Sequence, residues 1–382
     1  MMFTRLRTEK VYFIVILILL GAIVYFISQT VPKSFSPAYD ADEEVYKWEI
    51  ATLASGLEIP WDLALDETGR MFITERPGRL KVLEKNGEVK TIASLQQVVS
   101  VGESGLTGLA LHPDFSKNGY IYLYYTYRDS GEILNRVSRF ALKGDSLQGE
   151  KIILDKLPGG SIHNGGRLRF GPDGKLWVLT GDGARPALAQ DVNSLAGKVL
   201  RLNDDGTVPS DNPNKNSPVF SLGHRNPQGL AWHPLTEELL ITEHGETAHD
   251  EINLIRSNSN YGWPEVKRCF SSEPRFTNPI LCSGDETYAP SGVASFGTNI
   301  WRLRNSFVFA GLRGNLLERI EVVDSKITAR ETIIKGTYGR LRAVLIDKEG
   351  NIYVSISNRD GRGNPKEDDD KILKIIPKKM SP

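Results

Sequence analysis

Apolar and polar positions follow a pattern that returns several times along the chain. From about residue 48 onward, a short apolar segment leads into a turn of the Pro-Asp-Gly type, and a second apolar segment follows that often ends in Thr or Ser. Short apolar segments joined by tight turns predict β-hairpins. Copies of this hairpin pattern lie at residues 63–74, 109–126, 168–180, 230–242, 299–310 and 344–355, of which the fifth is degenerate.

The repeated hairpins predict the architecture. Repeats spaced by tens of residues indicate a solenoid, an array or a propeller, and radially packed four-stranded sheets leave no long exposed edges. We therefore expect an all-β fold, a six-bladed β-propeller over residues 48–378. The 36 Gly and 20 Pro residues alone would also fit a β-sandwich, but a sandwich would not repeat one hairpin six times. The longest interval, residues 261–295, is expected to cross one face.

The polar connections between the hairpins are the candidates for a functional site. In a propeller, connections of the same phase gather on one face around the axis, where a rigid scaffold presents them. They lie around His163 and at residues 101–105, 181–183, 223–229, 243–251, 311–314 and 339–342. We expect them to converge on one site.

His163 stands in a glycine-rich turn directly before the hairpin at residues 168–180. A side chain at the mouth of a turn that a hairpin holds suits a catalytic group, and imidazole titrates in the range useful for proton transfer near neutral pH. A loop histidine that only satisfies a hydrogen bond is the simpler alternative. The turn alone does not decide between the two.

Loop arginines indicate a ligand of negative charge. Arg225, Arg313, Arg340 and Arg342 accompany the amide of Asn226 in these connections. Guanidinium groups bind planar carboxylates through two parallel hydrogen bonds. Each arginine could instead form a structural ion pair. Arg340 and Arg342 are two apart on an extended segment and therefore share one face.

The loop at residues 243–251 carries a weaker indication of a metal. It contains Gly245 and ends in Asp250 and Glu251, and hard oxygen ligands of this kind suit calcium. The alternative is that the carboxylates only cap or solvate the next strand. The sequence lacks the signatures of serine hydrolases, P-loop NTPases, NAD-binding Rossmann folds and HExxH zinc enzymes.

Composition and charge narrow the class of protein. A hydrophobic content of 40% and a charged content of 25% are those of a globular chain. The 47 basic residues balance 47 acidic ones, so no basic field would attract nucleic acid. Cys269 and Cys282 are the only cysteines, which suggests one disulfide in an oxidising compartment, with two free thiols as the alternative.

The N-terminal region differs from the rest. Residues 11–31 carry no charge and are long enough to cross the hydrocarbon core of a membrane as a helix. The basic flank at residues 1–10 predicts a cytoplasmic N-terminus, with residues 32–47 as a linker to an extracytoplasmic propeller. A cleaved signal peptide is the alternative, although the apolar run is long for one and no clear cleavage site follows. We expect a single-pass protein of the cell membrane.

Eight short motifs occur in an order typical of one family. They are PWD at 60–62, TERPGR at 74–79, GLTGL at 105–109, HPDF at 112–115, HNGGRL at 163–168, GHRNPQG at 223–229, DEIN at 250–253 and NYGWP at 260–264. Over about residues 50–377 the chain resembles the glucose/sorbosone dehydrogenases. These quinoproteins are similar to soluble aldose dehydrogenases that use pyrroloquinoline quinone (PQQ). The family fold is a six-bladed propeller.

The resemblance implies a role for the loop residues. His163 would be the general base that takes the proton of the C1 hydroxyl of a sugar while hydride passes to the quinone, which gives the lactone. Arg225, assisted by Asn226, would polarise the quinone oxygen. Arg340 and Arg342 would bind the carboxylates of the cofactor.

The resemblance also implies a calcium ion and further cofactor contacts. Arg313 lies where the family has another basic residue that binds cofactor carboxylates. The backbone carbonyls of Gly245 and Glu246 would hold calcium as a Lewis acid, close to Asp250 and Glu251. The sequence does not name the electron acceptor.

Substrate contacts follow least directly from the resemblance. Glu103 stands where a glutamine that touches the sugar is expected, and a carboxylate there changes the polarity of the hydrogen bond. Gln190 is a second candidate contact, and Tyr288 and Phe296 are candidate aromatic contacts. Two other classes stay open, a non-catalytic propeller that binds a protein or glycan and a calcium-dependent lactonase-type hydrolase.

Overall fold

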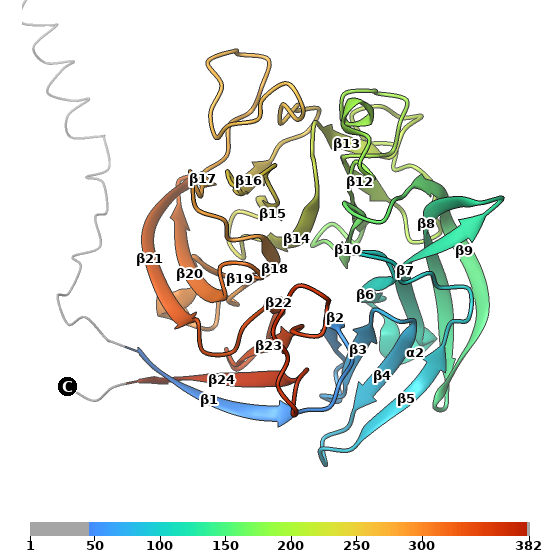
Figure 1. The fold of residues 1–382 in the computed structure, drawn as a ribbon, viewed down its shortest axis with the longest axis vertical. Coiled ribbons are helices and arrows are strands. Elements are labelled where there is room, and N and C mark those ends of the chain that lie inside the picture. Colours follow the sequence, from blue (N-terminus) through green and yellow to red (C-terminus); the bar gives the residue numbers. More distant parts are fainter. Residues whose placement is uncertain (1–45, 380–382) are drawn as a thin grey trace, which may run out of the picture. The chain divides into compact units, whose positions relative to one another are not determined.

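Six four-stranded sheets stand around a common axis in the computed structural model of this protein (Figure 1). The structure describes residues 46–379, of which Lys47–Lys378 form one unit. The predicted all-β, six-bladed propeller is therefore confirmed. None of the helices within residues 46–379 is long and apolar enough to cross a membrane, and the predicted anchor at residues 11–31 lies outside that range.

In each of the first three blades, four consecutive strands run from the axis to the rim. Blade one contains β2 (Pro60–Leu65), β3 (Met71–Glu75), β4 (Arg79–Leu83) and β5 (Val89–Ser94). Blade two contains β6 (Leu106–Leu111), α2 (Phe115–Asn118), β7 (Tyr120–Asp129), β8 (Glu132–Lys143) and β9 (Ser146–Pro158). Blade three contains β10 (Gly165–Phe170), β11 (Leu176–Thr180), the 3-10 helix η1 (Pro186–Ala189), β12 (Lys198–Leu202) and β13 (Val219–Leu222).

The last three blades continue the ring, and the final one borrows a strand from the start of the domain. Blade four contains β14 (Pro227–Trp232), β15 (Leu239–Glu243), β16 (Glu251–Ile255) and β17 (Leu281–Cys282). Blade five contains β18 (Pro290–Ser295), the 3-10 helix η2 (Trp301–Leu303), β19 (Ser306–Gly311), β20 (Leu316–Val323) and β21 (Lys326–Lys335). Blade six contains β22 (Leu341–Ile346), β23 (Ile352–Ile356), β24 (Ile372–Lys379) and, as its outer strand, β1 (Tyr46–Ala54).

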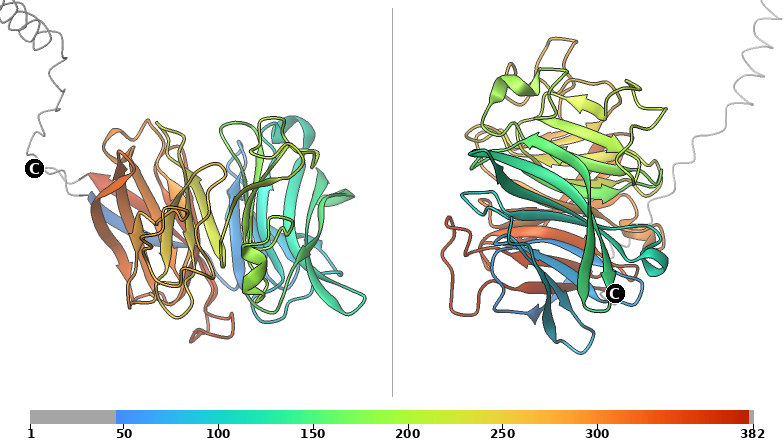
Figure 2. Two further views of the ribbon diagram at one scale, coloured as in Figure 1. Left: turned by 90° about the horizontal axis from the view of Figure 1, so that it is seen from above. Right: turned by 90° about the vertical axis from the view of Figure 1, so that its right-hand side faces the viewer.

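The ring closes without a free inner edge. Each inner strand contacts the next, from β2 through β6, β10, β14, β18 and β22 and back to β2. Side views show the blades packed face to face (Figure 2). Apolar clusters fill the space between neighbouring sheets, as where Phe72 and Leu80 of blade one meet Ile121 and Leu123 of blade two. The core is therefore divided among the blade interfaces, and the axis is left for polar groups.

Blade five departs from the predicted hairpin. Its inner strand is β18, whereas residues 299–303, expected to form a strand, contain η2. The sequence did not predict β18 because this strand begins Pro-Ser-Gly and therefore lacks an apolar segment at its start. Crowding at the axis explains the glycine, since a Cβ on Gly292 would lie 2.6 Å from the backbone nitrogen of Val344. The predicted crossing segment at residues 261–295 therefore also supplies β17 and β18.

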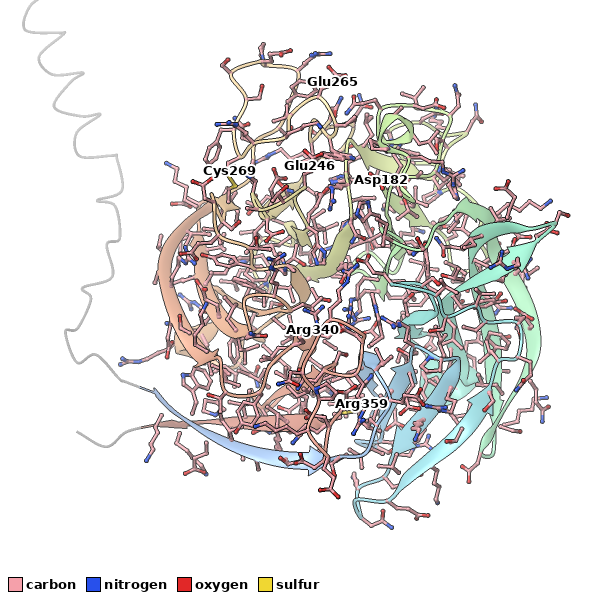
Figure 3. All side chains as sticks on the ribbon, in the orientation of Figure 1. Asp182, Glu246, Glu265, Cys269, Arg340 and Arg359 are labelled. Atoms are coloured by element: carbon pink, nitrogen blue, oxygen red, sulfur yellow. A yellow bond between two sulfur atoms is a disulfide. The ribbon has the colours of Figure 1, made fainter. Side chains whose placement is uncertain are left out.

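The disulfide expected from the two cysteines is confirmed. Cys269 and Cys282 are bonded, and their Cα atoms are 5.5 Å apart. Cys282 is the last residue of β17, so the bond fastens the long connection after β16 to the rim of blade four. Glu265 and Cys269 mark this connection at the periphery of the propeller (Figure 3).

All six inner strands share one irregularity. The pairing of each inner strand with the next strand shifts register within its first few residues, between Pro60 and Asp62 in blade one, for example, and between Leu341 and Val344 in blade six. A bulge re-aims the side chains beside it. Trp61, Gln228 and Arg342 lie at such shifts, and all three reach the axial cavity.

Candidate functional site

A cavity of about 480 Å³ opens at the axis, over the first residues of the inner strands. It draws residues from all six blades, as the loop pattern predicted. The predicted site residues that line it are Glu103, His163, Arg225, Asn226, Gly245, Glu246, Asp250, Arg313, Arg340 and Arg342. The structure thus brings together residues that span most of the folded chain.

His163 is held in one orientation by its neighbours. Its Nδ1 lies 2.9 Å from a carboxylate oxygen of Asp182, and Asp182 is buried. The other oxygen of Asp182 accepts a hydrogen bond of 2.9 Å from the indole of Trp263. His163 has a φ of 57°, which is uncommon for a residue other than glycine. A carboxylate at Nδ1 selects the tautomer with its proton there, which leaves the lone pair on Nε2.

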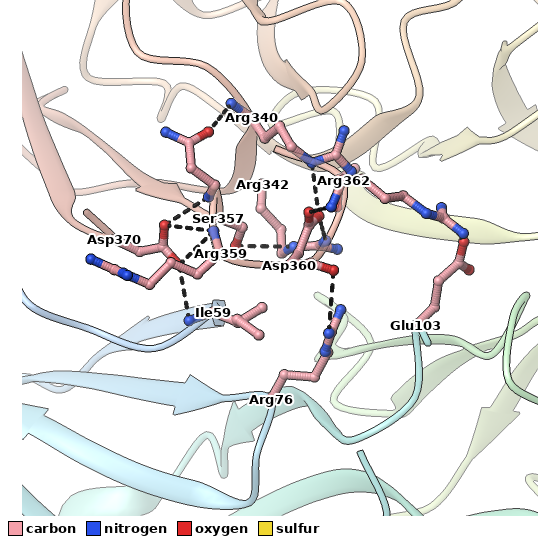
Figure 4. A network of polar contacts seen from close by, with 12 residues as sticks. Ile59, Arg76, Glu103, Arg340, Arg342, Ser357, Arg359, Asp360, Arg362 and Asp370 are labelled. Carbon is pink, nitrogen blue, oxygen red and sulfur yellow. Dashed lines mark hydrogen bonds and ion pairs between the residues drawn. The ribbon is translucent and has the colours of Figure 1, made fainter. Parts of the chain in front are cut away.

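Glu103 connects His163 to the opposite side of the mouth. One of its oxygens accepts a hydrogen bond of 3.0 Å from the backbone N–H of His163. The other accepts a bond of 2.6 Å from the guanidinium of Arg362, whose side chain is 57% exposed (Figure 4). Burial raises the pKa of Glu103, but the His163 N–H and nearby cations outweigh it and the pKa lies below its usual value. Glu103 is therefore ionised at neutral pH.

The wall formed by blade six is rich in arginine. Arg340 donates to Asp360 at 2.8 Å through Nε, and Arg342 donates to the same oxygen at 3.2 Å (Figure 4). Burial lowers the pKa of Arg342. Burial raises the pKa of Asp360, but the two arginines outweigh it and hold the pKa below its usual value. One carboxylate thus serves two buried guanidinium groups.

Arg225 and Asn226 occupy the wall between blades three and four. Glu243 accepts a hydrogen bond from the backbone N–H of Arg225, and its second oxygen lies 2.8 Å from Nδ1 of His224. The guanidinium carbon of Arg225 lies 5.3 Å from the centre of the Trp263 ring. Its Nε is buried without a hydrogen-bond partner among the described residues. Burial lowers the pKa of Arg225.

His244 lies behind Asn226 and was not predicted as a site residue. Its Nδ1 is 3.4 Å from the side-chain nitrogen of Asn226, and its Nε2 is buried with no partner in the described part of the chain. Burial lowers the pKa of His244 to about 4. The imidazole is therefore neutral, and a polar ring atom at the cavity wall is left for a ligand.

The loop after β15 presents backbone oxygen atoms. The carboxylate of Asp250 bonds to the backbone around it, because one oxygen accepts the N–H of Gly245 at 3.0 Å and the other accepts those of Tyr288 and Ala289 at 2.7 and 2.8 Å. No residue of the described part of the chain donates a hydrogen bond to the carbonyl oxygens of Gly245 and Glu246. Asp250 thus shapes the loop, and the two carbonyls are available to a cation.

Four predicted contacts lie elsewhere. Gln190 does not line the cavity, because its amide binds the side chain of Asn260 and the carbonyl of Trp263. Glu251 lines a smaller neighbouring cavity, and burial raises its pKa to about 8. Phe296 is buried in the core, and the hydroxyl of Tyr288 faces Arg330. Among residues 46–379, no three His, Cys, Asp or Glu side chains form a metal cluster.

Besides His244, five charged residues in or behind the cavity wall were not predicted individually. They are Arg76, Asp182, Glu243, Asp360 and Arg362. Asp182 and Arg76 stand in polar motifs, G-D-G and T-E-R-P-G-R, that the sequence did highlight. Asp360 and Arg362 stand in a polar segment after β23 at the same phase as the other loops, and this phase was the available signal.

Fold and cavity together define a class, a six-bladed propeller with a polar, cationic site on its axis. Comparison with known proteins narrows this class. The chain matches the family model "Glucose / Sorbosone dehydrogenase" over residues 57–372. It therefore belongs to that family, as its motifs indicated, and is an oxidoreductase.

Solved structures and a curated relative agree with this assignment. A putative glucose dehydrogenase of Thermus thermophilus is 41% identical with a TM-score of 0.80, covering 86% of this chain and all of the other. The PQQ-bound aldose sugar dehydrogenase of Streptomyces coelicolor is 34% identical with a TM-score of 0.80, covering 88% and 100%. The aldose sugar dehydrogenase YliI of Escherichia coli is 28% identical, covering 86% and 93%.

Proposed function

We propose that this protein is a PQQ-dependent dehydrogenase that oxidises the C1 hydroxyl of an aldose to the lactone. The PQQ-bound relative at 34% identity supports the cofactor, and the family supports the reaction class. One observation carries the proposal. A single cavity holds an imidazole oriented by a carboxylate and, facing it, a wall with more guanidinium groups than carboxylates.

The polar atoms of the cavity fit a planar polyanion. Buried nitrogens on Arg76, Arg225 and His244 have no partner among residues 46–379. Such groups are costly unless a ligand satisfies them. When bound, PQQ supplies an electron-poor quinone that accepts hydride. Arg340, Arg342 and Arg313 would bind its carboxylates, and Arg225 with Asn226 would stabilise negative charge on the quinone oxygen.

His163 would move the proton. With Asp182 at Nδ1, its Nε2 accepts the proton of the sugar hydroxyl, and Asp182 stabilises the imidazolium that results. Glu103 fixes the backbone of His163 and Trp263 fixes Asp182, so the imidazole needs no reorganisation when the sugar binds. Glu103 also provides a carboxylate acceptor for sugar hydroxyls at the mouth.

Calcium would be held by the carbonyls of Gly245 and Glu246, where it would act as a Lewis acid. Backbone oxygens are suitable ligands for this hard cation. The Glu246 side chain forms an ion pair of 3.2 Å with Lys267 at the edge of the loop. The carboxylate of Glu251 is outside the axial cavity and has no part in this proposal.

Reconstitution tests the proposed function. The full-length protein, purified without cofactor, would be mixed with PQQ and calcium, and binding would be followed by the absorbance of the quinone. Reduction of an artificial electron-accepting dye would then be measured with a panel of aldoses. We expect stoichiometric PQQ binding and aldose-dependent reduction. If PQQ does not bind, the cavity is that of a binding propeller or hydrolase and the proposal is wrong.

We also propose that residues 11–31 anchor the enzyme in the cell membrane with the propeller on the extracytoplasmic side. Their uncharged composition and basic N-terminal flank support this orientation, as does the disulfide, a bond typical of oxidising compartments. Protease added to intact spheroplasts should degrade the propeller while a cytoplasmic marker protein stays protected, and the protein should sediment with membranes. Recovery as a shortened product in the soluble extracytoplasmic fraction would show cleavage instead.

A further inference from the structure

Arg76 reaches the cavity from a rigid part of blade one. It follows β3 directly, its N–H donates to the carbonyl of Ile59 at 3.1 Å, and its carbonyl accepts from the N–H of Leu106 at 2.9 Å. A Cβ on Gly105 would lie 2.5 Å from Cγ of Arg76, so only glycine leaves room for the arginine stem there. The side chain is 8% exposed. Its guanidinium is thus placed by a backbone bonded on both sides.

This buried guanidinium has almost no hydrogen-bond partner. Nε has none among the described residues, and the one bond of Nη2, to the carbonyl of Asp360, is long at 3.5 Å. An arginine offers five N–H donors, and buried donors are normally satisfied. Burial lowers the pKa of Arg76, which is the expected effect of moving a charge out of bulk water.

Both oxygens of the nearby Asp360 carboxylate already accept hydrogen bonds from other residues. One oxygen of Asp360 accepts from Arg340 and Arg342, and the other accepts the N–H of Arg362 at 3.0 Å (Figure 4). Three buried guanidinium groups, those of Arg76, Arg340 and Arg342, therefore lie beside Asp360, and only the last two bond to its carboxylate. This corner of the cavity carries an excess of positive charge and unused donors.

A structural arginine in the same protein is different. Arg167 is also buried, and its Nη2 likewise has no partner among the described residues. Its guanidinium nevertheless forms an ion pair with Asp62, donates to the carbonyl of Gln228 at 2.8 Å and stacks on Trp61 at 4.1 Å. Arg76 has neither a side-chain carboxylate partner nor an aromatic ring beneath it in the described part of the chain. A purely structural role would leave the desolvation of Arg76 without compensation.

We propose that Arg76 is a ligand-binding residue, which with Arg340 and Arg342 binds a carboxylate of the bound cofactor. The inference rests on the proposed function, because it takes PQQ as the anion. The geometry adds blade one to a clamp that the sequence placed only in blades five and six. A guanidinium left unsatisfied without the ligand gains charge-assisted hydrogen bonds when the ligand binds.

Equilibrium binding of PQQ to the full-length protein, followed by quenching of tryptophan fluorescence, tests this role. Arg76→Met removes the charge at similar length, Arg340→Met is the positive control and Arg128→Met, at an exposed site, is the matched negative control. We expect Arg76→Met and Arg340→Met each to weaken PQQ binding by about 10–100-fold and Arg128→Met to leave it unchanged. Arg76→Lys should lie between Arg76→Met and the wild type, because it keeps the charge but loses the planar fork.

The stability of the cofactor-free variants separates the two roles. If Arg76 serves to bind a ligand, the cofactor-free Arg76→Met variant should unfold at the same temperature as the wild type or at a higher one, because an unpaired buried charge is removed. A lower unfolding temperature together with unchanged PQQ affinity would mean that Arg76 is structural, and the inference would be wrong. Failure of the wild type to bind PQQ would contradict the proposed function instead.

Discussion

The wall of the axial cavity around His163 and the wall around Arg76, Arg340 and Arg342 differ in how completely their charged groups are paired. On the His163 wall every charged group has a partner, since Asp182 holds the imidazole, Trp263 holds Asp182 and Glu103 holds the His163 backbone. On the arginine wall, Arg340 and Arg342 share one carboxylate oxygen of Asp360, and Arg76 reaches only the backbone carbonyl of Asp360. A complete hydrogen-bond network fixes a geometry, whereas an incomplete one creates affinity for a missing anion. The first suits proton transfer and the second suits cofactor binding.

The largest effect is expected from removing the imidazole. His163→Ala should lower kcat for aldose oxidation by about 10²–10⁴-fold, because a positioned general base contributes that much. PQQ affinity should stay within about threefold of the wild type, because the His163 wall supplies no carboxylate clamp. Steady-state kinetics and fluorescence titration measure the two quantities. Retained activity would remove His163 from the mechanism, and a large loss of affinity would mean that the walls are not separate.

A smaller loss is expected when the imidazole stays but loses its support. Asp182→Asn should lower kcat by about 10–10³-fold, since an amide no longer selects the Nδ1–H tautomer or stabilises imidazolium. KM and PQQ affinity should change little. Thr180→Ser, two residues before Asp182, is a control for local disturbance, because Ser keeps the hydroxyl that bonds to the carbonyls of Leu195 and Lys198. Equal rates for Asp182→Asn and wild type would contradict the positioning role.

A carboxyl outside both walls should affect stability rather than catalysis. Burial raises the pKa of Glu251 to about 8, with the adjacent Glu243 contributing. Folding then favours the protonated form, so this contribution to stability is complete below pH 4.5 and is lost as the pH rises through about 8. Urea unfolding in a chelator should show Glu251→Gln gaining about 4 kcal/mol on the wild type between pH 5 and 9. A constant difference across this range would contradict the raised pKa.

The smallest effect should come from the contact that joins the walls. Glu103→Gln keeps an acceptor for the N–H of His163 but removes the ion pair with Arg362, which is partly exposed and therefore weak. We expect a two- to fivefold change in KM, about 1 kcal/mol or less, with kcat almost unchanged. Arg362→Gln should have a similar effect, and the double variant should be no worse than either single one. Additive effects would show that the two residues act separately.

Local sequence patterns predicted most of the fold and most of the cavity lining. Hairpins at residues 63–74, 168–180 and 344–355 were found because short apolar segments and turn chemistry are short-range properties. The inner strand of blade five was missed because packing at the axis requires glycine at position 292, which erases the apolar signal. The position of Gln190 was predicted wrongly because the residues around it in the sequence do not show that its side-chain amide bonds to Asn260.

By itself, the sequence determined the number of blades, the family and the loops that meet at the axis, because repeats and motifs consist of residues that are close together along the chain. Only the tertiary structure decided which charges are paired. Glu103 meets Arg362 across 259 positions, and Arg76 reaches Asp360 across 284. Such pairs depend on the closure of the ring, which brings its first and last blades side by side. Whether an arginine is neutralised or left for a ligand is therefore a property of the closed propeller.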